Sequence, residues 1–82
     1  MDRTGRDPRI RPGADVLGFD GQKVGTIVAV GADHLVVERG WLAVTRYRIP
    51  TAAVAGLERG TVLLTVTKDQ ALARGWEVPP TT

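Results

Sequence analysis

The chain has 82 residues, which is the size of one small domain, and a domain of this size buries only roughly 60% of its unfolded surface. It contains neither cysteine nor serine, so disulfides, thiolate metal sites and Ser-His-Asp or Cys-His catalysis are all excluded. The net charge is +2. The whole excess lies in residues 1–12, where four arginines stand against two aspartates, because the rest of the chain has seven basic and seven acidic residues.

Residues 1–12 are rich in Arg, Pro and Gly and have no apolar periodicity, so a disordered basic tail is predicted. The alternative is an electrostatic arm for RNA or an acidic partner. This stretch has no apolar core of the kind found in a signal peptide, and no apolar run approaches the roughly 20 residues that span a membrane. We therefore expect a cytoplasmic protein without a membrane span. The residues of the alternative nucleic-acid arm are Arg3, Arg6, Arg9 and Arg11.

A β-hairpin is predicted over residues 19–37. Asp20-Gly21 is a tight-turn dipeptide, and the β-branched run that follows it predicts a strand over 23–30. Gly25 inside this strand indicates a bulge, a bend or the close approach of another backbone. The residues around Asp33 break the run, and an apolar strand resumes over 35–39. A short strand over 14–18 precedes the hairpin.

The second half of the chain predicts further short strands. Residues 40–46 are ambiguous between a strand and an irregular excursion, and a strand over 47–49 ends at Pro50, which cannot donate to a ladder. A short turn over 51–55, a brief strand or turn over 56–60 and a last apolar strand over 61–66 complete the series.

One helix is predicted, over residues 68–74. Thr67 and Gln70 have the spacing of a capping box, and Gly75 is the expected C-terminal stop. About two turns of helix are too short to stand alone, so the helix must dock on the sheet. Pro79-Pro80 ends the order, so residues 77–82 are predicted to be a disordered tail.

Five or six short antiparallel strands and one short C-terminal helix define the expected fold class, all-β, as a small barrel or sandwich. The chain resembles PRC-barrel-type domains, which include the cytoplasmic domain of the photosynthetic reaction-centre H subunit and the C-terminal domain of a bacterial ribosome-maturation factor. The resemblance lies in the stretches ADVLGFDGQKVGTIVAV, DHLVVERG and YRIPTAAVAGLERGTVLLTVTKDQA.

The resemblance implies a PRC-like barrel over residues 13–76 that acts as a binding or assembly module through protein contacts, without a cofactor. The matching positions belong to the scaffold and none is a catalytic signature. They are Gly21, Val24, Gly25, Ile27, Ile49, Pro50 and Val54.

A search of the residues for chemistry favours a non-enzymatic protein. The one histidine, His34, is interpreted as a turn residue, against a rival role as ligand or base, and the acidic residues do not cluster in a metal-binding pattern. No cofactor or metal is expected. The aromatic residues are too scattered for a base-stacking platform. Tyr47 is expected in the core or in an interface, and Trp41 and Trp76 either pack within the monomer or make contacts in a homodimer or with another protein. The predicted interface residues are Trp41, Leu42, Tyr47 and Trp76.

Overall fold

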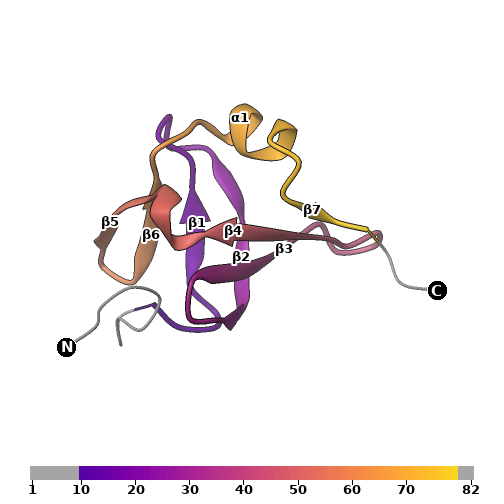
Figure 1. Cartoon of the computed structure of the whole chain (residues 1–82), viewed down its shortest axis with the longest axis horizontal. Helices are drawn as coiled ribbons and strands as arrows, with labels where there is room; N and C mark the ends of the chain where they lie inside the picture. Colours follow the sequence, from indigo (N-terminus) through magenta and orange to yellow (C-terminus); the bar gives the residue numbers. More distant parts are fainter. Residues whose placement is uncertain (1–9, 80–82) are drawn as a thin grey trace.

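The structure, a computed structural model, describes residues 10–79. Short strands follow one another closely, and a single short α-helix comes near the end of the described chain (Figure 1). The elements are β1 (Asp15–Leu17), β2 (Lys23–Val30), β3 (His34–Arg39), β4 (Thr45–Pro50), the 3₁₀ turn η1 (Thr51–Ala53), β5 (Val54–Glu58), β6 (Thr61–Leu64), α1 (Lys68–Ala73) and β7 (Glu77–Val78).

Within residues 10–79 the strands form one seven-stranded sheet in the order β5-β6-β1-β2-β3-β4-β7. All neighbours are antiparallel except β1 and β6, which are parallel. The prediction of antiparallel strands alone is therefore wrong at this pair. The physical reason is that η1 carries the chain from β4 into β5 without reversing it, so that β6 enters the sheet in the same direction as β1.

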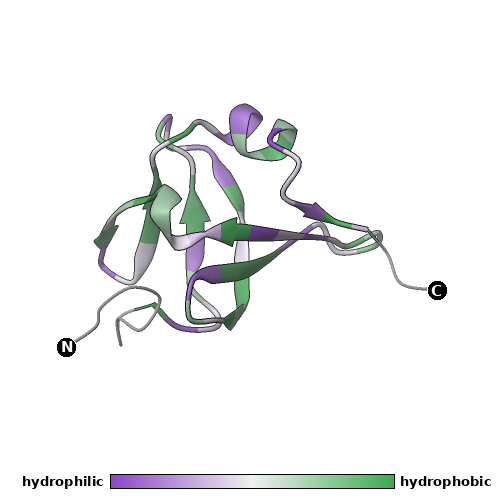
Figure 2. Ribbon diagram, viewed as in Figure 1, coloured by the Kyte–Doolittle hydropathy of each residue, from purple (hydrophilic) through white to green (hydrophobic). Residues whose placement is uncertain are grey.

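The core is built from alternating side chains of the central strands. Val16 of β1, Val24 and Ile27 of β2, and Val62 and Leu64 of β6 are almost completely buried. Ala71 of α1 packs on the same cluster, so the helix docks on the sheet as predicted. Figure 2 shows apolar residues concentrated in the middle of the sheet. The other buried core members are Ile10, Leu35, Val37, Tyr47, Ile49, Ala53 and Val66.

Gly25 is the point of closest approach between β2 and β3. A Cβ at this position would overlap the carbonyl oxygen of Glu38 and press on a methyl group of Val37. Of the three roles expected for Gly25, a bulge, a bend or the close approach of another backbone, the structure shows the last. On the same strand, the register with β3 shifts between Ile27 and Ala29, because one residue of β2 is extra there. Such bulges bend a strand and increase its twist, and two further register shifts occur in β1–β2 and β5–β6.

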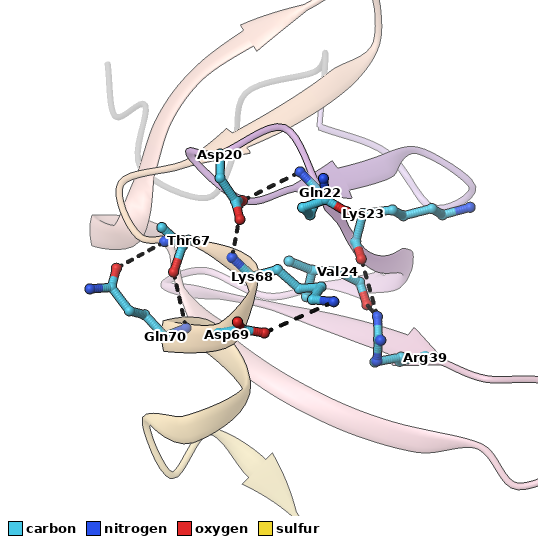
Figure 3. Close-up of polar contacts among 9 residues, drawn as sticks. All are labelled: Asp20, Gln22, Lys23, Val24, Arg39, Thr67, Lys68, Asp69 and Gln70. Carbon is cyan, nitrogen blue, oxygen red and sulfur yellow. Dashed lines mark hydrogen bonds and ion pairs between the residues drawn. The ribbon is translucent and has the colours of Figure 1, made fainter.

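The start of α1 is held from two sides (Figure 3). Thr67 and Gln70 form the predicted capping box, with Oγ1 of Thr67 accepting from the backbone N–H of Gln70 and Oε1 of Gln70 accepting from that of Thr67. A carboxylate oxygen of Asp20 accepts from the backbone N–H of Lys68 at 3.2 Å and from that of Gln22 at 3.3 Å. The turn before β2 and the helix are therefore joined by one side chain.

Parts of both predicted tails belong to the described fold. Ile10, placed in the predicted tail 1–12, is buried in the core, whereas residues 1–9 lie outside the described residues. Glu77 and Val78, placed in the predicted tail 77–82, form β7 against Tyr47 and Arg46 of β4. A two-residue strand carries no periodic signal, and its position depends on a partner strand about thirty residues away in the sequence.

The glycine contact yields a matched pair of stability predictions. We expect Gly25→Ala to lower the free energy of unfolding by about 1–3 kcal/mol, since the new methyl group must displace backbone. Gly56→Ala is the control, because a Cβ there meets nothing within 4 Å. Urea unfolding of both variants measures the difference, and equal stabilities would contradict the role assigned to Gly25.

Candidate interaction site

The β3–β4 hairpin positions a loop, residues 40–44, at one end of the long axis of the molecule (Figure 1). The hairpin register is unbroken from His34 opposite Pro50 to Arg39 opposite Thr45. Gly40 has a positive φ of 96°, and a Cβ there would meet the carbonyl oxygen of Ala43. We call the far half of this hairpin, its loop and the adjoining β7 the arm. The ambiguous segment 40–46 is thus mainly loop, and its last two residues begin β4.

The loop presents two large apolar side chains to solvent. Trp41 is 85% exposed and Leu42 is 84% exposed. Val44, at the end of the loop, and Val78, on β7, are also exposed. These four residues are the arm surface. Folded domains normally expose large apolar residues singly, so several of them on one arm make this surface a candidate contact site.

Charged side chains surround the arm surface. Nε of Arg46 lies 2.8 Å from Oε2 of Glu38, in a cross-strand ion pair. The guanidinium of Arg39 donates to the carbonyl oxygens of Lys23 and Val24, each at 3.1 Å, which fastens the base of the arm to β2. The arm therefore combines an apolar tip with fixed charges of both signs.

The structure separates the four predicted interface residues. Trp41 and Leu42 lie together at the tip, whereas Tyr47 is only 7% exposed and belongs to the core. Tyr47 is buried because alternate residues of β4 face inward, which also leaves Arg46 and Arg48 exposed on the opposite face, as predicted. Trp76 is partly buried against the core, beneath the guanidinium of Arg74 at 5.8 Å.

Two members of the arm surface were not predicted. Val44 continues the apolar run of the loop, so the sequence contained a signal for it. Val78 had none, because only the pairing of β7 with β4 brings it to the arm. The predicted nucleic-acid-binding arginines belong to the N-terminal stretch and are not part of the arm. Arg3, Arg6 and Arg9 lie outside the described residues, and Arg11 is exposed.

His34 has a local role at the turn before β3. Its Nδ1 lies 2.9 Å from a carboxylate oxygen of Asp33, and this hydrogen bond holds the pKa of Asp33 below its ordinary value. The imidazole also fills the space beside Gly31, where a Cβ would meet the ring. Among residues 10–79, no cluster of three or more His, Asp or Glu side chains is arranged to hold a metal ion.

No described helix has the length and apolar character needed to cross a membrane. Comparison with protein-family models, with curated proteins and with solved structures finds no match for this chain.

The placement of the aromatics yields a second prediction. We expect Trp41→Ala to change the free energy of unfolding by no more than about 0.5 kcal/mol, as for a surface substitution. We expect Tyr47→Ala to lower it by about 3 kcal/mol, because a buried ring is removed from the core. Thermal and urea unfolding at low protein concentration measure both, and a large loss in Trp41→Ala would show that the indole packs within its own domain.

Proposed function

We propose that this chain is a non-catalytic protein-interaction module that binds its partner through the arm surface. The observation that carries the proposal is the pair of neighbouring side chains, Trp41 and Leu42, each more than four-fifths exposed at the end of a hairpin. Burying a leucine side chain contributes about 1.5–3 kcal/mol, and tryptophan is among the residues most enriched at the energetic centre of protein interfaces. A partner that covers the tip therefore gains a large part of its binding energy from two residues.

The local construction of the arm supports this role. The hairpin register is regular to the last pair, and Gly40 sets the loop. Arg39 holds the base of the arm to β2 through two hydrogen bonds. A loop fixed in this way loses little conformational freedom on binding, which favours affinity.

We also propose that the sheet closes on itself as a PRC-like barrel, in line with the resemblance in sequence. Support comes from η1, which connects β4, near one edge of the sheet, directly to β5, the strand at the other edge. The N–H of Thr51 donates to the carbonyl of Asp33 at 3.0 Å, and the N–H of Thr65 donates to the carbonyl of Ala53 at 2.8 Å. The two bonds join the region before β3 to the region after β6 through this turn.

Capture of partners tests the interaction role. The immobilised full-length chain is incubated with lysate of the native cell, and bound proteins are quantified by mass spectrometry. We expect Trp41→Ala and Leu42→Ala to reduce capture of specific partners at least tenfold, in keeping with loss of roughly 2 kcal/mol at a hot spot. Phe19→Ala is the matched control, since Phe19 is 74% exposed but lies in the turn before β2. Equal capture by all four proteins would refute the proposal.

The alternative function is an RNA- or ribosome-associated module that uses the arginine-rich stretch of residues 1–12. The observation that favours it is the confinement of the net positive charge to this stretch. If it holds, the full-length chain binds RNA with an affinity that falls steeply with salt, and Arg→Gln substitution at Arg3, Arg6, Arg9 and Arg11 abolishes binding. Absence of binding at low salt in a filter or fluorescence-anisotropy assay would remove this alternative.

A further inference from the structure

A shallow hollow lies on the side of the arm, lined by residues of β3, the end of the loop, the start of β4, and β7 with the proline that follows it. Val44, Val78 and Pro79 supply its apolar lining, and Glu38, Arg46 and Glu77 supply its charged lining. Its volume is about 570 Å³, which falls within the roughly 300–1,000 Å³ of sites that hold small molecules. An indole ring is smaller than this space, so the hollow has room for one aromatic side chain and part of its backbone.

The same arm carries an aromatic side chain that fills no site in its own chain. Trp41 does not line the hollow, although it lies in the loop that leads into it, and its 85% exposure shows that the indole contacts little of its own domain. One arm thus carries both an exposed aromatic side chain and a hollow that can hold such a side chain. An isologous dimer requires a surface of this self-complementary kind, because residue i of one copy meets residue j of the other and the reverse.

We propose that the partner of the arm is a second copy of this chain, with Trp41 of each copy seated in the hollow on the side of the other copy's arm. The proposal rests on the proposed function and names the partner of the same site. Two arms side by side and antiparallel place both tips beside both hollows through one two-fold axis. Leu42 of each copy then covers the rim formed by Val44 and Val78 of the other.

The charges of the hollow fit this arrangement. Arg46 points a half-exposed guanidinium toward solvent while it pairs with Glu38. Glu77 lines the same hollow and makes no ion pair among the described residues. Across the two-fold axis, Arg46 of one copy therefore meets Glu77 of the other, twice. Complementary charges at a rim fix the register of two partners more than they add affinity.

The surface area that the dimer would bury sets its expected affinity. Each seated tryptophan removes about 150–250 Å² of its own surface from water, and the walls that receive it lose a similar amount. Two such contacts bury on the order of 600–1,000 Å², and Leu42, Val44 and Val78 bring the total close to the roughly 1,200 Å² at the lower end of stable interfaces. We therefore expect a weak dimer that dissociates on dilution.

Sedimentation equilibrium of the full-length chain, from micromolar to millimolar concentration, tests for this dimer. The expected mass rises from 8.8 kDa to twice that value as concentration increases. Trp41→Ala weakens association at least tenfold, whereas Phe19→Ala, at the other exposed aromatic, leaves it unchanged. A mass that stays near 8.8 kDa, or a Trp41→Ala variant that associates like the native chain, would overturn the proposal.

Charge exchange tests the arrangement. Glu77→Arg brings Arg46 of one copy against an arginine of the other, and Arg46→Glu brings two glutamates together, so each variant alone should lose association at least tenfold. A mixture of the two variants restores opposite charges at both contacts, and we expect the mixed dimer to form. Arg48→Glu is the control, since Arg48 is exposed on the same face of β4 but does not line the hollow. Thermal unfolding of each variant separates lost association from lost folding.

Because the chain has no cysteine, a thiol cross-link gives an independent measurement. A mixture of Leu42→Cys and Val78→Cys chains, treated with a short bis-maleimide, should cross-link between copies much faster than a mixture of Phe19→Cys and Val78→Cys. Equal rates would overturn the arrangement. The proposed function is judged separately: if the chain is a monomer and Trp41→Ala still abolishes capture of another protein, the arm is an interaction site and only its assignment to a second copy fails.

Discussion

The close approach of β2 to β3 at Gly25 is the contact on which the rest of the structure depends. β2 is the longest strand and pairs with both β1 and β3, so its curvature is passed to neighbours on either side. Absence of a side chain at Gly25 lets the backbone of Glu38 come into contact, and the extra residue between Ile27 and Ala29 bends the strand further along. A curled sheet can enclose a core on one concave side, which a flat sheet of this size cannot do.

The same curvature divides the apolar residues of the chain into two groups. Those on the near half of β3 and β4, such as Leu35 and Ile49, face the core and are buried. The hairpin then continues beyond the core, and no strand or helix other than the two residues of β7 accompanies it within residues 10–79 (Figure 1). Trp41 and Leu42 are exposed because the chain carries them past the end of the core, and the hydrophobic effect that buries the other residues has no surface there on which to act.

Local features were predictable because each depends on a few adjacent residues. The Asp20-Gly21 turn, the capping box at Thr67 and the close approach at Gly25 follow from residue type and short spacing. Features that depend on distant pairing were not. The parallel pairing of β1 with β6 follows from the path of the chain through η1. The two residues of β7 form a strand only because they pair with the edge of β4 that β3 leaves open. Of the arm surface, the sequence pointed to Trp41 and Leu42 by size and position, and it carried a signal for Val44 but none for Val78; Tyr47, expected in the core or an interface, lies in the core.

The residues that form the core of this chain and the residues proposed for interaction are different ones. A domain of this size has little stability to lose, so an interaction site built from core residues would unfold the protein whenever the site changed. Here the core includes Val16, Val24 and Leu64, while the exposed tip and the hollow on the side of the arm contribute little to it. The guanidinium of Arg39 adds two hydrogen bonds between the base of the arm and the backbone of β2, beside the ladder that already pairs β2 with β3. Substitutions at the exposed tip are therefore expected to leave the fold intact, whereas substitutions of the core residues are not.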